Sequence, residues 1–245
     1  MIKGIFSAAA GMLPRINQQE TVGNNLANVN TVGFKADRRY FSHELNSHML
    51  AGGASPASMM SSPEVSILIT DFSPGILIET RNPLDVALSG TGFFVLETGE
   101  SHSYTRAGNF TLNAQGELVN SQGHRVLGAE GPIRIEGKDV KIRSDGTIFV
   151  DDEPIGSLLI IDFPQPYQLK RNGWGYFVTN PSQEPIIPDK VEVRQGFLEN
   201  SNVDPILEML QMIELNRSYE SCQKAILSQD ETLKLAVTDL PKLKG

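Results

Sequence analysis

The two ends of the chain repeat their residues at helical spacing. Near the N-terminus a repeat alternates steps of three and four, at Ile2, Ile5, Ala9, Met12, Ile16, Gln19, Gly23 and Leu26. This spacing predicts a helix over about 2–28 with a narrow seam, which suits left-handed coiling against another helix. Glycines and Pro14 lower the intrinsic stability of this helix, so packing has to supply what propensity lacks.

A second seam near the C-terminus repeats every seven residues, at Met212, Tyr219, Ile226, Leu233 and Leu240. Asn202 or Asp204 can cap this helix, and Pro205 fits its first turn, where a missing N–H costs little. We expect the helix to continue to about residue 240. Two seams at opposite ends of one chain can close against each other and pack against copies from other molecules. We therefore predict an assembly seam formed by Ile5, Met12, Ile16, Leu26, Met212, Tyr219, Ile226, Leu233 and Leu240.

Beside this seam, a second row of positions spaced by seven begins at Met209 and ends at Val237 on the C-terminal helix. Polar residues interrupt it at intervals of seven, at Asn216, Gln223 and Asp230. They either form a solvated helix edge or set the register against neighbouring helices, as single buried polar residues do in coiled coils.

From Val65 onward the apolar period becomes two, which predicts short strands. We expect these strands at 84–88, 93–96, 109–112, 117–119, 133–135, 140–142, 148–150 and 156–163. Turn residues separate them, so the middle of the chain reads as an antiparallel β domain. Residues 47–63 are rich in Ala, Gly, Ser and Met without a period, which is typical of a linker or loop.

The predicted fold class is therefore α+β, with the terminal helices as one discontinuous core domain. That domain comprises 1–34 paired with 200–245, followed in sequence by a linker at 35–64 and a β-rich outer domain at 65–199. No long helices alternate with the strands, which disfavours a doubly wound α/β enzyme fold.

The segment between the first helix and the linker reads as a turn. Asn24, Asn25, Leu26 and Asn28 end the helix, because asparagine tolerates the left-handed cap conformation. Gly33 is free to take a positive φ, and Phe34 is available as an anchor.

Composition and charge narrow the function classes. Hydrophobic residues make up 40% of the chain and charged residues 20%, as in ordinary folded proteins. A net charge of −8 argues against a nucleic-acid partner, because phosphate binding needs a basic face. No run approaches the ~20 apolar residues of a membrane-spanning helix, so membrane insertion is not expected. The apolar start is too short for a cleaved signal peptide.

No catalytic, cofactor-binding or metal-binding constellation emerges. Gly90-Thr91-Gly92 lies between two strands, lacks a third glycine and reads as a β turn. The four histidines and the single cysteine, Cys222, do not pair at metal-ligand spacings. No Gly-x-Ser-x-Gly elbow presents a serine nucleophile. We therefore predict a non-enzyme that uses no cofactor or metal, with Cys222 as a helix-packing residue.

Several segments, in order along nearly the whole chain, resemble one family. The segment 24–35 (NNLANVNTVGFK) is similar to the N-terminal signature of bacterial flagellar rod and hook proteins. Likeness continues through 82–87 (NPLDVA), 90–94 (GTGFF) and 104–110 (YTRAGNF). Near the other end, 196–203 (GFLENSNV) and 212–214 (MIE) look like the family's C-terminal signature.

The resemblance implies a structural subunit of the axial drive shaft that crosses the bacterial envelope, with a terminal-helix core and an outer β domain. It implies location in the periplasmic span of the basal-body rod and export, unfolded and without signal cleavage, through the flagellar type III apparatus. The implied partners are that apparatus, other rod and hook axial proteins, and copies of the chain itself. Head-to-tail contacts that build open helical assemblies suit such a shaft, which transmits torque through packed contacts.

Within the family, 131–133, 145–147 and 169–173 favour a proximal rod subunit. A distal rod subunit or another axial protein is the alternative, since 201–203 is shared by both rod types. An alternative from another class is a secreted β-domain enzyme or carbohydrate-binding protein with coiled-coil ends. That alternative needs a cleft with convergent acids or aromatics, and the chain has only Trp174 as tryptophan and 7% aromatic residues.

Overall fold

The computed structural model describes residues 2–42, 65–99, 101–172, 175–179, 183–188 and 191–239, with side chains except at 2–10, 41–42, 65–66 and 236–239. These residues form two compact units. Among the described residues, the helical unit comprises those within 2–27, 36–42, 65–71 and 203–239, and the β unit comprises those within 28–35 and 72–202. The predicted linker at 47–63 and seam residue Leu240 lie outside the described residues.

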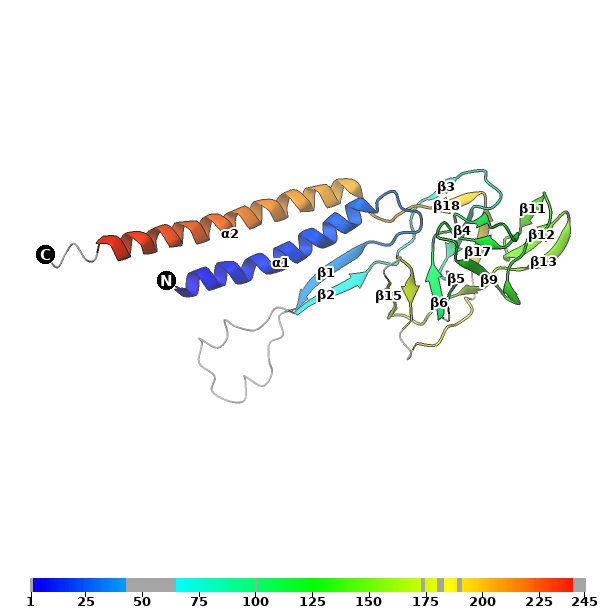
Figure 1. Ribbon diagram of the computed structural model, residues 1–245, viewed down its shortest axis with the longest axis horizontal. Coiled ribbons are helices and arrows are strands. Elements are labelled where there is room, and N and C mark those ends of the chain that lie inside the picture. The colour runs from blue at the N-terminus through cyan, green and yellow to red at the C-terminus, as the bar shows by residue number, and fades with distance from the viewer. Residues whose placement is uncertain are drawn as a thin grey trace. The chain divides into compact units, whose positions relative to one another are not determined.

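The described residues of the helical unit form two helices and a two-stranded ribbon (Figure 1). Helix α1 (Ile2–Ala27) packs along α2 (Pro205–Asp239), and both confirm the helices expected from the seams. The Asp204 carboxylate caps α2 by accepting hydrogen bonds from the backbone N–H groups of Ile206 (2.9 Å) and Leu207 (3.3 Å). Strands β1 (Asp37–Ser42) and β2 (Val65–Thr70) pair antiparallel, and β1 contacts α1.

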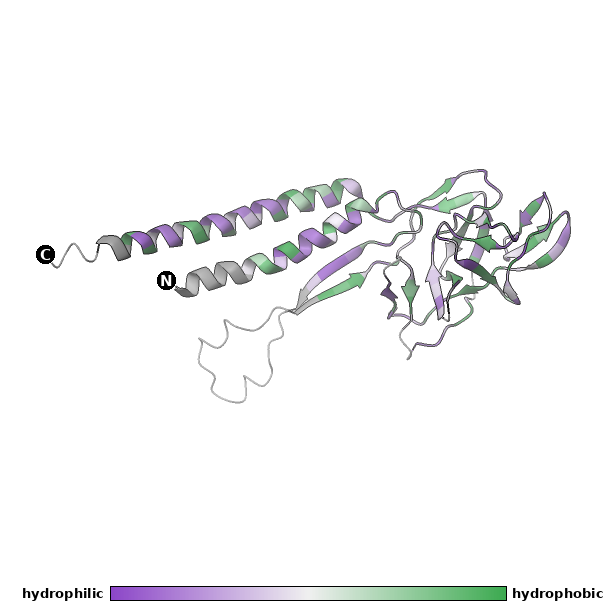
Figure 2. Cartoon of the chain, in the orientation of Figure 1, coloured by the Kyte–Doolittle hydropathy of each residue, from purple (hydrophilic) through white to green (hydrophobic). Residues whose placement is uncertain are grey.

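Strand β1 corrects the sequence prediction, which places 35–64 in a linker. The backbone N–H and C=O of Asp37 both bond to the side-chain amide of Asn25, at 2.9 Å each, which fixes the start of the strand against α1. The two strands of the ribbon differ in character, because β1 is polar and β2 is apolar (Figure 2). Residues 28–34, which the sequence assigns to the helical domain, and Lys35, which it assigns to the linker, belong instead to the β unit.

The β unit consists of short antiparallel strands: β3 (Leu77–Glu79), β4 (Val86–Gly90), β5 (Phe93–Thr98), β6 (Ser101–Thr105), β7 (Thr111–Leu112), β8 (Leu118–Val119), β9 (Arg125–Gly128), β10 (Gly131–Pro132), β11 (Val140–Ile142), β12 (Thr147–Val150), β13 (Glu153–Ser157), β14 (Ile160–Ile161), β15 (Lys170–Arg171), β16 (Phe177–Val178), β17 (Val191–Gln195) and β18 (Phe197–Glu199). The largest sheet follows the order β15-β16-β6-β5-β9-β8-β7. Smaller sheets pair β11-β12-β13, β17-β4 and β18-β3. The α+β class is thus confirmed.

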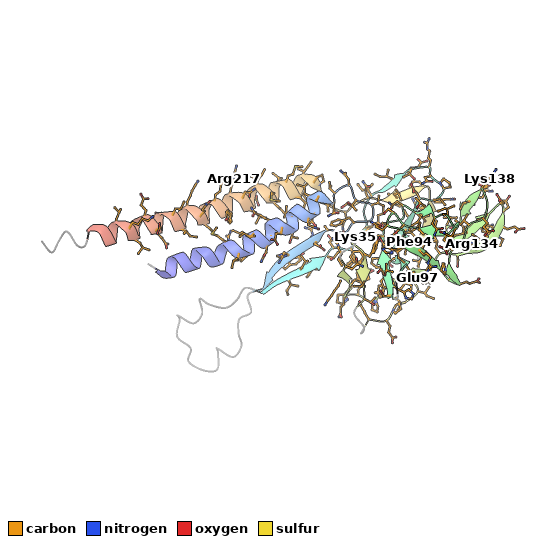
Figure 3. The ribbon with its side chains drawn as sticks, in the orientation of Figure 1. Lys35, Phe94, Glu97, Arg134, Lys138 and Arg217 are labelled. Atoms are coloured by element: carbon orange, nitrogen blue, oxygen red, sulfur yellow. The ribbon has the colours of Figure 1, made fainter. Side chains whose placement is uncertain are left out.

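Strand β5 lies between two apolar clusters and organises the core. Phe93 and Val95 belong to one cluster, while Phe94 and Leu96 belong to the other. Because successive side chains of a strand point to opposite faces, the run of four apolar residues is buried on both sides. Figure 3 shows Phe94 among the side chains of the β unit, with Arg134 and Lys138 exposed at its surface.

Two predicted strands differ from the structure. Residues 133–135 are not a strand, although the side chains of Ile133 and Ile135 are buried in the core. The segment 156–163 contains parts of two short strands instead of one long strand. Between them the backbone N–H groups of Leu158 and Leu159 bond to Gly146 and Leu127, which lie on different neighbours.

Candidate assembly face and charged junction

The predicted seam residues with described side chains are all half-buried in the helical unit. On α1 these are Met12, Ile16 and Leu26, and on α2 they are Met212, Tyr219, Ile226 and Leu233. Helix α1 contains Ile5, whose side chain is not described. One contact between the helices is explicit, because a Cβ atom placed on Gly23 would lie 3.8 Å from the Met212 methyl carbon. Whether these residues act as an assembly seam stays a prediction.

The row of α2 residues that is covered beside this seam is not the row that begins at Met209, which the sequence suggests. Met209 is 52% exposed, whereas the buried or half-buried positions are Glu208, Leu215, Cys222 and Gln229. Positions three and four residues from a seam residue are both its neighbours on a helix, so heptad spacing alone does not choose between them. The two rows together give α2 an inner face with alternating steps of four and three.

Polar groups also join α1 to α2. The amide of Gln19 donates to the Asn216 side-chain oxygen at 2.5 Å, and the Arg15 guanidinium donates to the Ser218 hydroxyl. Asn216 is exposed, and it nevertheless bonds across to the partner helix. These bonds fix the lengthwise register of the two helices more specifically than the half-buried apolar contacts do.

The signature turn divides into residues with distinct surroundings. Asn25 is buried and holds the start of β1, while Asn24 is exposed and Asn28 is half-buried. Asn28 uses its backbone and side-chain oxygens to accept from Thr31, at 3.0 and 3.1 Å. The Arg171 guanidinium carbon lies 4.3 Å from the centre of the Phe34 ring, which gives Phe34 a cation–π contact inside the β unit.

Gly33 has a φ of 68°, as the sequence predicts. A Cβ atom there would lie 2.3 Å from the backbone nitrogen of Ala107. Its own N–H donates to the Glu199 carbonyl oxygen at 2.7 Å. The turn therefore needs glycine both for its backbone conformation and for the close approach of the backbone at Arg106 and Ala107.

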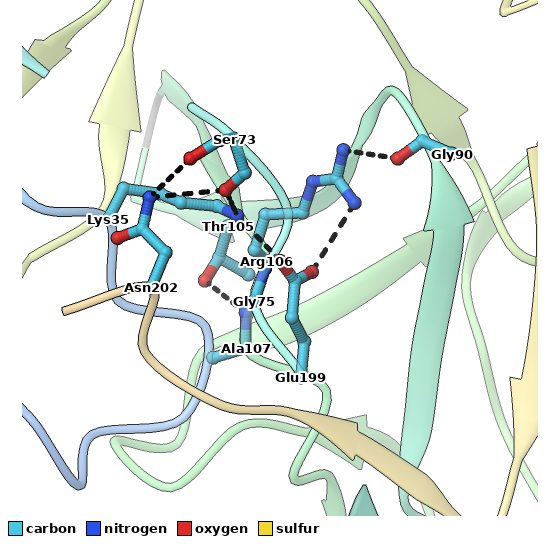
Figure 4. A network of polar contacts seen from close by, with 9 residues as sticks. All are labelled: Lys35, Ser73, Gly75, Gly90, Thr105, Arg106, Ala107, Glu199 and Asn202. Carbon is cyan, nitrogen blue, oxygen red and sulfur yellow. Dashed lines mark hydrogen bonds and ion pairs between the residues drawn. The ribbon is translucent and has the colours of Figure 1, made fainter. Parts of the chain in front are cut away.

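Three buried charged residues meet inside the β unit, and we call them the charged junction (Figure 4). The Lys35 ammonium lies 2.5 Å from Glu199 Oε1, and Arg106 contacts Glu199 Oε2 at 3.4 Å. Side chains of Lys35 and Glu199 are fully buried, and that of Arg106 is 5% exposed. Burial lowers the pKa of the Arg106 guanidinium, and the charge of Glu199 opposes that effect.

Backbone groups complete the charged junction. Lys35 also donates to the Ser73 carbonyl oxygen at 2.7 Å, and Arg106 donates to that of Gly90 at 2.7 Å. Glu199 Oε1 accepts from the Gly75 N–H at 2.9 Å. These bonds compensate the charges for the water they lose on burial, and they tie together segments from both ends and the middle of the chain.

Sequence reasoning missed the charged junction. Lys35, Arg106 and Glu199 each occur inside a segment that carries the family resemblance, but nothing in their spacing shows that they meet. Each of the three motifs at 24–35, 104–110 and 196–203 contains a single charged residue among uncharged ones. This is the signal that could have identified them, because a charged residue that becomes buried needs a partner.

The described residues offer no cluster of three or more His, Cys, Asp or Glu side chains with which to hold a metal ion. Of the four histidines, His43 and His48 lie outside the described range. Neither helix, over the residues searched, is long and apolar enough to cross a membrane. The loop Gly90-Thr91-Gly92 connects β4 to β5, and both its glycines have positive φ values.

Three family models match the chain. Residues 8–35 match the flagella basal body rod protein, 87–150 the D1 domain of the flagellar hook protein FlgE/F/G, and 194–238 the C-terminal region of the flagellar basal body rod FlgEFG protein. Each matched segment contributes one member of the charged junction. The junction thus joins the three recognisable parts of the family.

Curated relatives cover almost the whole chain. The flagellar basal-body rod protein FlgF of Mesorhizobium japonicum is 32% identical, with 96% of this chain and 98% of the relative covered. FlgG of Bacillus subtilis is 31% identical, with coverage of 95% and 97%, and FlgF of Escherichia coli is 31% identical, with 94% and 95%. The chain therefore belongs to the flagellar basal-body rod proteins and is a structural subunit of that rod.

Proposed function

We propose that the chain is a proximal rod subunit whose helical unit binds neighbouring subunits and whose β unit is a preformed outer body. The observation that best supports a preformed β unit is the charged junction. Its ion pairs connect residues from all three segments that match the family. A body closed in this way keeps its shape under load, because breaking its ion pairs would leave charges that are still buried without their partners.

The helical unit supplies the groups that a neighbour can cover. Beginning at the N-terminus of α2, large apolar residues are exposed on the side away from the inner face, at Ile206, Met209, Leu210 and Ile213. Exposed apolar patches of this kind mark interaction surfaces. Repetition of such contacts from head to tail builds an open helical shaft that transmits torque without any bond being made or broken.

The partners in this proposal are other rod and hook axial proteins and copies of the chain. The chain reaches the rod unfolded, through the flagellar type III export apparatus and without removal of its N-terminus. The pairing of α1 with α2 in the assembled rod is coiled-coil-like. Segments 131–133, 145–147 and 169–173 favour the proximal position, while relatives named FlgF and FlgG are similar to the chain to nearly the same degree.

Complementation tests the position in the rod. The gene for the chain is introduced into strains that lack either their proximal or their distal rod subunit, and basal bodies are imaged by cryo-electron microscopy. Recovery of rod assembly in the strain without the proximal subunit, with density for the chain at the base of the rod, supports the proposal. Recovery only in the strain without the distal subunit assigns the chain to the distal rod.

A further inference from the structure

Glu208 is a buried carboxyl group in the first turns of α2, where α1, β1 and α2 meet inside the helical unit. The exposed fraction of Glu208 is only 6%. It lines a groove of about 610 Å³, whose other residues come from α1, β1 and α2. A carboxylate at such a position loses most of its hydration when the helical unit packs.

Protein groups compensate for this loss only in part. Glu208 Oε1 accepts a hydrogen bond of 3.3 Å from the side-chain amide of Asn25, and Oε2 has no hydrogen-bond partner among the residues that the structure describes. The same amide donates to the Asp37 carbonyl oxygen at 2.9 Å, so both of its N–H groups are used. Asn25 therefore has no further donor to offer to Oε2.

Charged groups of both signs surround Glu208. Asp204 caps its helix and Glu214 lies on it. On β1 the charged residues are Asp37, Arg38 and Arg39, and on α1 Arg15 lines the same groove. Arg38 contacts Asp71 at 3.4 Å, Arg39 donates to the Thr21 hydroxyl at 3.2 Å, and Arg15 bonds to Ser218. Within the described part of the chain, none of these arginines forms an ion pair with Glu208.

We propose that Glu208 is a proton-linked latch of the helical unit: α1, α2 and β1 close on the protonated side chain, and its ionisation loosens them. In the free subunit near neutral pH, the ionised latch opposes closure, so the helical unit stays available for assembly. Asn25 positions the carboxyl group and β1 together, which places the latch at the point where all three elements join.

The electrostatic surroundings agree with this geometry. Burial raises the pKa of the Glu208 carboxyl, and the charge of Asp204 raises it further. The Asn25 hydrogen bond and the charge of Arg38 lower it, but burial is the largest effect. A raised pKa in the folded state means that the folded unit binds the proton more tightly than the unfolded chain does. Its stabilising contribution is complete below the ordinary glutamate pKa, and it is lost as pH rises through the raised value.

Cys222 makes the latch measurable, because it is the single cysteine and lies half-buried on the inner face of α2. The experiment follows the rate at which a small thiol reagent labels Cys222 in the isolated full-length subunit between pH 5 and 7.5. Each rate is divided by that of the urea-unfolded chain at the same pH, which removes the ionisation of the thiol itself. Far-UV circular dichroism reports helix content in the same samples.

The variants are Glu208→Gln, which keeps the shape without the charge, and the matched control Glu231→Gln, at an exposed position of α2 that does not line the groove. We expect wild-type labelling to become several-fold slower as pH falls, with a rise in helix content. Glu208→Gln labels several-fold more slowly than wild type at pH 7.5 and shows little pH dependence, while Glu231→Gln behaves as wild type. A wild-type rate independent of pH, a Glu208→Gln variant labelled as fast as wild type or faster at pH 7.5, or an equal effect of Glu231→Gln would overturn the proposal.

Discussion

The β unit and the helical unit solve the problem of stability in different ways. The β unit buries large side chains completely, including Phe93, Phe94 and Phe110, and it closes its charged junction internally. Among described residues of the helical unit, the fully or nearly buried apolar side chains are Val22, Ala36 and Val203. A unit with so little interior depends on added contacts, because ordering each residue costs about 1–2 kcal/mol of backbone entropy. The comparison indicates a body that folds alone and a connector that is completed by neighbours.

The largest effect on the isolated subunit is expected from the charged junction. Glu199→Ala leaves Lys35 and Arg106 as buried cations without a counter-charge, so the β unit should lose about 3–5 kcal/mol of unfolding free energy. Urea unfolding followed by tyrosine and tryptophan fluorescence measures the loss. The control is Glu79→Ala, since Glu79 pairs with Arg81 at the surface at 3.2 Å and contributes about 0–1 kcal/mol. Equal losses in both variants would show that the β unit does not depend on its buried charges.

A smaller loss is expected at the signature turn. Gly33→Val forces a branched residue to a φ of 68° and places its Cβ against the Ala107 backbone, at a cost of at least about 2 kcal/mol. Gly123→Val is the matched control, because Gly123 has a φ of 85° with no atom within 4 Å of the added Cβ. Urea unfolding should separate the strain, which both variants share, from the overlap at Gly33.

Gly33→Val should also impair assembly after export. Culture medium should then contain secreted subunit, while isolated basal bodies lack complete rods. If the variant builds complete rods and unfolds like the Gly123→Val control, the close approach at Gly33 has no structural consequence.

The smallest effect on the isolated subunit should come from the predicted seam. Burying isoleucine is worth about 1.5–3 kcal/mol, but Ile226 is only half-buried on a helix that lacks its neighbours. Ile226→Asp should therefore change the unfolding of the β unit by less than about 0.5 kcal/mol, as is usual for changes outside a packed core. In cells the same change should block incorporation into the rod, as motility and basal-body imaging would show.

Lys224→Ala, at an exposed position of the same helix, serves as the control for the seam. It should leave both incorporation and motility unchanged. Normal motility of the Ile226→Asp strain would contradict the seam, and loss of β-unit stability would contradict the independence of the two units.

Local patterns in the sequence predict the two helices, most of the strands and the turn at Gly33. The apolar seams predict α1 and α2, and Asp204 and Gly33 have the roles that their residue types suggest. These features depend on neighbours a few residues away, so periodicity and turn chemistry contain the information.

Features that depend on tertiary closure were not predictable in this way. Lys35, Arg106 and Glu199 are far apart in sequence, and only the folded β unit makes one carboxylate the partner of two cations. Strand β1 was not predictable from the local sequence for a related reason, because its start depends on the side chain of Asn25 in α1. The inner face of α2 contains Leu215 and Cys222, and Met209 is exposed. Which of these positions is covered depends on the packing of α2 against α1, which lies far away in the sequence.

Amide hydrogen exchange on the isolated full-length subunit near neutral pH tests the contrast between the two units most directly. Strands β5, β6 and β9 should be strongly protected, because they lie in the packed core of the β unit. Amides of α1 and α2 should exchange within the shortest labelling times, since the helical unit lacks the neighbours that complete it. Strong protection across 2–26 in the isolated subunit would contradict the account, because the helical unit would then fold without assembly.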